Sequence, residues 1–146
     1  MAIYKRILVA VDMSNEAEQV LKKTVELASY SNATIDAIHV VEPVVVETTF
    51  DVTPTIDVEL EDQLVTRSKS FISGLQASLG MSIDKILVPV GSTKREIHEA
   101  AKARGSDLII VGSHGRHGVG LLLGSTANAI LHGAPCDVLS VKVNTE

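Results

Sequence analysis

A strand, a glycine-rich loop and the start of a helix follow one another in the stretch Asp107-Leu-Ile-Ile-Val-Gly-Ser-His-Gly-Arg-His-Gly-Val-Gly-Leu-Leu-Leu-Gly-Ser-Thr-Ala-Asn-Ala-Ile-Leu-His132. Its beginning is a short apolar run typical of a buried strand, and its end can continue a helix. The glycines between them let the backbone approach an anion and adopt a positive φ. The first N–H groups of a helix lack partners within it, and the helix dipole favours negative charge there. The stretch therefore predicts a site for phosphate.

The strand in this stretch is one of five short β-rich runs along the chain. They are Arg6–Val11, Thr34–Val41, Lys85–Val90, Asp107–Gly112 and Asp137–Val143. Most of them are continuous in Ile, Val and Leu rather than alternating with polar residues, which indicates parallel strands buried on both faces.

Helical patterns lie between the strand-like runs. The first begins at Ser14, the second spans about Val58–Leu79, the third spans Thr93–Arg104, and the fourth follows Ser125 or Thr126. Ser14 is a candidate N-cap, and Thr93 with Glu96 has the spacing of a capping box. Strands that alternate with helices predict an α/β protein whose parallel sheet carries helices on both faces. The connection Glu42–Asp57 contains two prolines and is a loop, an extra edge strand or a lid, three alternatives that the sequence leaves open.

Composition limits the class of protein. The 146 residues are 45% hydrophobic and 21% charged, so we expect one globular domain over residues 1–146. A net charge of −5 and 3% aromatic residues argue against nucleic-acid binding. The single cysteine, Cys136, cannot form an internal disulfide and suits a reducing compartment. Neither a signal peptide nor a run of the ~20 apolar residues that span a bilayer is visible, so we expect a cytoplasmic protein without membrane insertion.

Polar groups are expected beyond the carboxyl ends of the first two strands, where ligands bind in open parallel sheets. The first strand ends in Ala10, Val11 and Asp12, and the Asp12 carboxylate can accept hydrogen bonds from a ribose or an adenine amino group. Asp12 can equally be a turn residue or a helix cap. Backbone groups near Val40 can read an adenine edge. His39 lies inside an apolar run, and we expect it to be partly buried and hydrogen-bonded.

The glycine-rich loop supplies further candidates and few catalytic groups. Arg116 is placed to meet phosphate, and Ser125 and Thr126 offer hydroxyls at the helix start, where capping and phosphate binding use the same geometry. His114 and His117 have a spacing that can bind a metal, but no cysteine or third acidic ligand accompanies them, so we assign no metal site. The P-loop, dinucleotide and nucleophile-elbow motifs are absent from the expected positions. We assign no catalytic residue.

The chain resembles the universal stress protein family over essentially its whole length. The residues that carry the resemblance are Tyr4–Ser14, Ile38–Val41, Gly112–Thr126 and Ala134–Val141, and they are specific in combination although each is weak alone. The resemblance implies an α/β three-layer sandwich with a five-stranded parallel sheet of order 3-2-1-4-5 and a Rossmann-like site for an adenine nucleotide. It also implies a homodimer through the final strand, which would cover that strand if it lies at a sheet edge.

Family members with a Gly-x2-Gly-x9-Gly-[Ser/Thr] motif bind ATP, and members without the glycines do not. On this chain the motif matches Gly112, Gly115, Gly124 and Ser125, whose backbones would wrap the phosphates and ribose. One departure is that eight residues, not nine, separate Gly115 from Gly124. The deletion lies in the middle of the loop, so we expect binding to survive with altered phosphate contacts or affinity.

The same resemblance matches Asp12 to the family's acidic residue after the first strand and Val40 to the position that contacts adenine. The candidate ATP-binding residues are Ala10, Val11, Asp12, Val40, Gly112, Ser113, His114, Gly115, Arg116, Gly124, Ser125 and Thr126.

The resemblance implies a cytoplasmic, homodimeric stress-response protein that binds ATP, alone or with Mg²⁺. It would act as a nucleotide-dependent regulator or as an interaction module for an unidentified protein. Any ATP hydrolysis should be slow, because neither a Walker lysine nor an obvious general base is present. Two alternatives stay open: a nucleotide hydrolase that uses the same pocket, and a structural dimer that binds no nucleotide.

Overall fold

The structure is a computed structural model and describes residues 3–46, 55–113 and 125–144. Its elements in chain order are β1 (Arg6–Ala10), α1 (Ala17–Ser31), β2 (Thr34–Ile38), β3 (Val45–Val46), β4 (Thr55–Ile56), α2 (Val58–Leu79), β5 (Lys85–Leu87), α3 (Thr93–Arg104), β6 (Leu108–Gly112), α4 (Ser125–Leu131) and β7 (Asp137–Val141).

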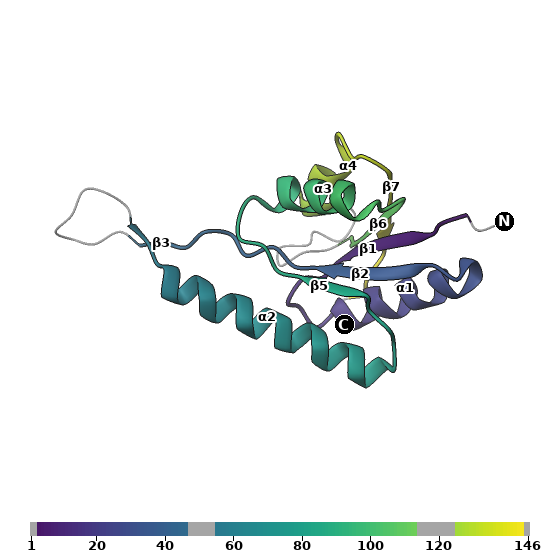
Figure 1. Ribbon diagram of the computed structural model, residues 1–146, viewed down its shortest axis with the longest axis horizontal. Coiled ribbons are helices and arrows are strands. Elements are labelled where there is room, and N and C mark those ends of the chain that lie inside the picture. Colours follow the sequence, from purple (N-terminus) through teal and green to yellow (C-terminus); the bar gives the residue numbers. More distant parts are fainter. Residues whose placement is uncertain (1–2, 47–54, 114–124, 145–146) are drawn as a thin grey trace.

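The main sheet has five parallel strands in the order β5-β2-β1-β6-β7. When the strands of this sheet alone are counted along the chain, the order is 3-2-1-4-5, as expected. Helices α1 and α2 cover one face of the sheet, and α3 and α4 cover the other (Figure 1). The predicted three-layer α/β architecture is therefore confirmed.

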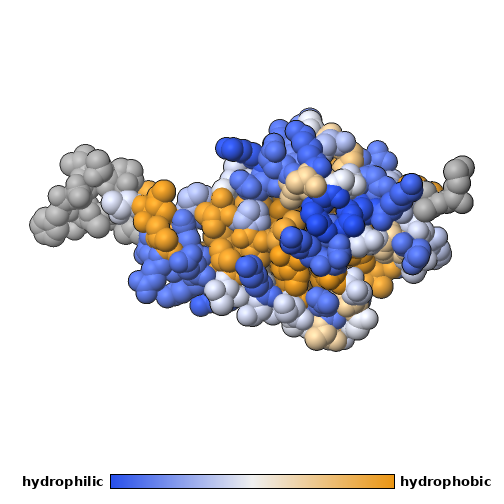
Figure 2. All heavy atoms as spheres, in the orientation of Figure 1, coloured by the Kyte–Doolittle hydropathy of each residue, from blue (hydrophilic) through white to orange (hydrophobic). Residues whose placement is uncertain are grey.

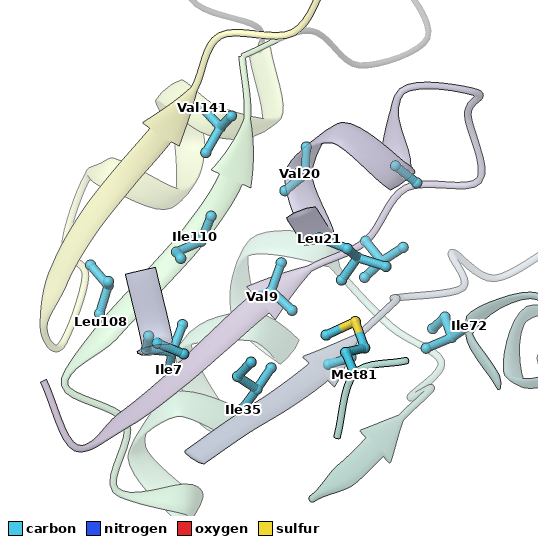
Figure 3. Packing of buried hydrophobic residues seen from close by; sticks show 14 of the residues in the cluster. Ile7, Val9, Val20, Leu21, Ile35, Ile72, Met81, Leu108, Ile110 and Val141 are labelled. Carbon is cyan, nitrogen blue, oxygen red and sulfur yellow. The ribbon is translucent and has the colours of Figure 1, made fainter. Parts of the chain in front are cut away.

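Successive residues of the central strands point to opposite faces of the sheet, so each strand supplies both halves of the core. Ile7 and Val9 of β1 pack on the side of α1 and α2, together with Ile110 of β6 (Figure 3). Leu8 of β1 and Ile109 of β6 pack on the side of α3 and α4. Burial on both faces explains why these strands read as continuous apolar runs.

The strands are shorter at their carboxyl ends than the sequence predicted. The apolar runs suggested that the first two strands reach Val11 and Val41, but β1 ends at Ala10 and β2 ends at Ile38. A single parallel bridge between Val41 and Val90 continues the pairing beyond β2 and β5. The residues directly after β1 and β2 are thus still apolar, but they are no longer part of the regular hydrogen-bond ladder of the sheet.

The described part of the connection after β2 contributes two short strands that form a separate small sheet, so they are not an extra edge strand of the main sheet. Val45 of β3 pairs antiparallel with Ile56 of β4, apart from the main sheet. Figure 1 shows β3 and the start of α2 projecting from the rest of the molecule. Figure 2 shows an apolar patch at this projecting end. Helix α2 begins with Asp57 as its N-cap, whose carboxylate accepts from the Leu60 N–H at 3.0 Å.

One predicted helix start is wrong, and a second helix starts where predicted but has a different capping residue. Helix α1 begins at Ala17 rather than directly after Ser14, and the Ser14 hydroxyl accepts from the Glu16 N–H at 3.2 Å. Ser92 is the N-cap of α3, so Thr93 is the first helical residue and its hydroxyl donates to the Glu42 carboxylate at 3.1 Å. Within the described residues, no helix combines the length and the hydropathy that crossing a membrane requires.

Candidate functional site

Five of the candidate residues meet at the carboxyl edge of the sheet. Ala10 ends β1, Val11 and Asp12 follow it, Val40 lies two residues beyond β2, and Gly112 ends β6. Strand β1 pairs with both β2 and β6, so these three chain ends are neighbours. This is the edge at which open parallel sheets bind ligands.

Asp12 turns the chain away from the sheet directly after β1. Its Oδ1 atom accepts hydrogen bonds from both the N–H, at 3.1 Å, and the hydroxyl of Ser14. An aspartate that bonds the backbone two residues ahead forms an Asx-turn. Asp12 is therefore the turn residue that the sequence offered as one alternative, and its second carboxylate oxygen, Oδ2, makes no hydrogen bond within the described residues. The half-buried side chain can serve the turn and a ligand at once.

Val40 carries backbone groups that the sheet does not use. His39 and Val41 on either side of it donate to Leu87 and Pro89, which lie on the β5 side. The Val40 N–H and C=O alternate with these and so face the β1 side. In the part of the chain that the structure describes, neither group forms a hydrogen bond, although Val40 as a whole residue is only 8% exposed. One donor and one acceptor thus lie side by side at the end of the ladder.

His39 lies half-buried next to this position, as the sequence predicted. Its Nδ1 atom is 2.7 Å from the Val11 carbonyl oxygen. Because a carbonyl only accepts hydrogen bonds, Nδ1 carries the proton and donates. The ring therefore bonds across the end of the β1–β2 ladder.

The candidates of the glycine-rich stretch are described only at its two ends. Ser113 donates from its N–H to Val141 at 2.8 Å, and its hydroxyl accepts from the Val143 N–H at 3.3 Å, so its contacts are directed to the β7 side. Ser125 and Thr126 begin α4 and are exposed. His114, Gly115, Arg116 and Gly124 lie outside the described residues, as does His117.

Helix α4 is held in place from its other end. His98 of α3 is 9% exposed, and its Nε2 atom donates to the carbonyl of Ile130 at 2.8 Å. Ile130 is fully buried and packs with Ile97 in the core on this side. The sequence analysis did not identify His98, whose position in an amphipathic helix resembles that of any half-buried polar residue.

Other reactive groups lie away from this edge. Burial raises the pKa of the Cys136 thiol, which disfavours the reactive thiolate. Among residues 3–46, 55–113 and 125–144, no three His, Cys, Asp or Glu side chains are grouped so that they could hold a metal ion.

The amino edge of the sheet contains an ionic cluster that the sequence analysis missed. Asp36, in the middle of β2, is fully buried and receives two hydrogen bonds from Arg104, at 3.0 and 3.1 Å, and one from Arg6 at 3.0 Å. Asp84 bonds the same two arginines at 2.8 and 3.0 Å. A charged residue within the apolar run Thr34–Val41 was the available signal.

Comparisons with known proteins agree in one direction. The model of the universal stress protein family matches residues 3–142. The chain is 44% identical over 142 residues to universal stress protein A homolog 2 of Coxiella burnetii, covering 96% of each chain. It is 39% identical over 140 residues to homolog 1 of the same organism, covering 94% of this chain and 96% of that one.

Solved structures show the same fold. Universal stress protein UspA from Lactobacillus plantarum superimposes with a TM-score of 0.79 at 28% identity, covering 97% of this chain and 99% of that chain. A universal stress protein crystallised in complex with cAMP superimposes with a TM-score of 0.63 at 22% identity, covering 94% and 96% of the two chains.

Proposed function

The chain belongs to the universal stress protein family, and we propose that it is a member that binds ATP at the carboxyl edge of its sheet. The phosphates would lie along the glycine-rich stretch between Gly112 and Ser125, and Asp12 would hold the ribose. When ATP binds as its magnesium complex, Mg²⁺ would lie with the phosphates.

The observation that carries this proposal is the free peptide of Val40. Its N–H and C=O face the β1 side without a partner in the described chain, next to the Asp12 turn. The adenine edge offers a ring nitrogen that accepts and an amino group that donates, which is the complement of this pair. Binding pockets use a small number of such fixed polar groups within an apolar lining, and the Val40 side chain belongs to the core cluster below.

Two further observations support the proposal. The fold is that of a universal stress protein whose structure was solved with cAMP, an adenine nucleotide. The glycine-rich stretch follows β6 in the sequence, and β6 ends with Gly112 at the same edge of the sheet as Val40.

The physiological role that we propose is that of a cytoplasmic homodimer that responds to nucleotide as a regulator or interaction module. Strand β7 ends the sheet, and its Val138 and Leu139 are half-buried in the single chain. Pairing with the same strand of a second copy would cover this edge about a two-fold axis. Hydrolysis of ATP would be slow, because the sequence contains neither a Walker lysine nor an obvious general base.

The first experiment identifies what the native protein carries. Nucleotide released by mild acid is separated by chromatography and identified by mass, and ATP is then added to emptied protein while its melting temperature is followed. A ligand that binds only the folded state must raise that temperature. A stoichiometric adenine nucleotide and a thermal shift support the proposal. Empty protein without a shift contradicts it and favours the nucleotide-free dimer.

Two variants test where the nucleotide binds. We expect both Asp12→Ala and Gly115→Ala to weaken ATP binding, because the first removes a carboxylate and the second places a side chain in the expected phosphate loop. Glu18→Ala is the matched control, since Glu18 is an exposed carboxylate of α1 that pairs with Lys22 of the same helix at 3.1 Å. Unchanged ATP affinity in both site variants would rule out the assigned site. Multiple-turnover release of ADP or AMP would instead favour a hydrolase.

A further inference from the structure

The β1–β2 ladder stops one hydrogen bond earlier than its register allows. In a parallel ladder a residue donates to the partner strand one position back and accepts from one position ahead. Val11 donates to the Ile38 carbonyl at 2.8 Å, so its own carbonyl should accept from the Val40 N–H. The structure shows the first bond and lacks the second.

The acceptor for that second bond is occupied by a side chain. The Val11 carbonyl accepts from His39 Nδ1 at 2.7 Å, a shorter contact than the neighbouring ladder bonds of 2.8–3.0 Å. The imidazole thus replaces the Val40 amide as the donor at this position. The Val40 carbonyl is freed separately, because the Asp12 turn removes the residues after β1 that would have donated to it.

We propose that His39 is a positioning residue that keeps the Val40 peptide open for the adenine edge. His39 does not touch the nucleotide in this account. It occupies the one backbone acceptor to which the Val40 N–H would otherwise bind, so that this N–H stays available. The inference rests on the proposed function for its ligand, but the open ladder itself is a property of the chain alone.

Closing the β1–β2 ladder should have opposite effects on the two properties: it stabilises the fold and weakens nucleotide binding. A backbone donor that pairs within the sheet is no longer free for a ligand, and an unpaired donor is costly unless solvent or ligand reaches it. Replacing the imidazole with a side chain that cannot donate should therefore let the ladder close by one bond. Closure compensates the loss of the His39 bond and removes the adenine-reading donor.

The test uses two substitutions of similar shape. His39→Asn retains a donor, because the Asn Nδ2 atom is attached to Cγ as the His Nδ1 atom is, whereas His39→Leu has none. We expect His39→Leu to bind ATP at least ~10-fold more weakly, as expected for the loss of one well-placed hydrogen bond, and His39→Asn to stay within about threefold of the native protein. A purely structural role would instead lower the melting temperature without separating the two variants in ATP affinity.

The direct readout is the Val40 amide in protein without nucleotide. By NMR we expect it to exchange rapidly in the native protein and in His39→Asn. In His39→Leu it should become protected and show a coupling through the new hydrogen bond to the Val11 carbonyl carbon. His98→Leu is the control, because it removes another histidine-to-carbonyl bond, of 2.8 Å, in which the Val40 peptide takes no part.

The outcomes separate the two levels of the argument. A protected Val40 amide in the native protein, or an unprotected one in His39→Leu, overturns the role of His39. If ATP fails to bind the native protein, the proposed function fails, while the exchange contrast still decides whether His39 holds the ladder open. If the ladder closes in His39→Leu and ATP affinity does not change, the Val40 peptide does not read the base.

Discussion

The two edges of the sheet differ in whether their polar groups have hydrogen-bond partners. At the amino edge, Asp36 is fully buried and bound by Arg6 and Arg104, and the Asp107 carboxylate accepts from the backbone N–H groups of Lys5 and Arg6 at 2.8 and 3.1 Å. At the carboxyl edge, the Val40 peptide is unpaired in the described chain.

The contrast shows how one sheet separates stability from binding. Buried charges are tolerated only when they are paired, and at the amino edge the buried Asp36 carboxylate is paired with two arginines. Free backbone groups cost stability but are available for recognition. Substitutions at the amino edge should therefore change the free energy of unfolding, and those at the carboxyl edge should change ligand affinity.

The largest expected effect comes from breaking the ion cluster. Arg104→Met removes two of the three hydrogen bonds to the buried Asp36, and we expect it to lower the free energy of unfolding more than any other substitution named below, because the buried carboxylate loses most of its compensation. Chemical denaturation measures it. Lys102→Met on the same helix is the control, because its 4.0 Å pair with Glu99 is exposed, and it should change stability by less than about 0.5 kcal/mol. Equal losses in both variants would mean that the cluster has no special weight.

A smaller loss is expected at Asp107. Asp107→Ala leaves the N–H groups of Lys5 and Arg6 without their acceptor, and we expect it to cost about 1–3 kcal/mol. Asp107→Asn keeps one acceptor oxygen and should lose roughly half as much. Thermal unfolding compares the two variants. An Asn variant as unstable as the Ala variant would assign the effect to charge rather than to the hydrogen bonds.

Ser14→Ala tests the carboxyl edge by the same measure. The variant removes the hydroxyl contacts to Asp12 and to the Glu16 N–H, and we expect a loss of only about 0.5–1.5 kcal/mol. Since the Ser14 N–H still bonds Asp12, the turn should persist and ATP should bind more strongly than to Asp12→Ala. Denaturation and ATP titration on one preparation provide both values. A stability loss as large as that of Arg104→Met would erase the difference between the edges.

The smallest expected effect is on the stability of the protein at low pH. A hydrogen bond from Arg6 holds the pKa of Asp84 below its ordinary value of 3.8. Because the folded-state pKa is lowered, the stabilisation is present above about pH 4 and is lost as the pH falls through the folded value. We expect Asp84→Asn to be less stable than the native protein at neutral pH and to lose less stability below about pH 4. If the free energies of unfolding of the two proteins fell equally with decreasing pH, this account would be contradicted.

The sequence predicted the architecture well because burial on both faces leaves a clear pattern. The continuous apolar runs located all five strands of the main sheet, and the predicted ends of α2 at Leu79 and of α3 at Arg104 are confirmed. Parallel pairing and two helical layers followed from the alternation of elements. Asp12 and Val40 were placed at the correct edge for the same reason.

What the sequence did not predict depends on hydrogen bonds between distant residues. Asp36 and Arg104 are 68 positions apart, and no local pattern joins them. The carboxyl ends of β1 and β2 read as strand because Val11 and Val40 are apolar, yet the His39 ring and the Asp12 turn end the ladder early. The start of α1 was misjudged at Ser14, and the N-cap of α3 is Ser92 rather than Thr93, because several neighbouring residues could cap each helix.

The central position of β1 has a consequence for synthesis on the ribosome. One side of this strand pairs with β2, only a helix away, while the other waits for β6, where Val9 meets Ile110. A nascent chain can therefore form the β1–β2 pair early but must keep the opposite edge of β1 open until most of the protein has emerged. Contacts of such long sequence separation slow folding. During that interval the open edge of an apolar strand can pair with strands of other chains.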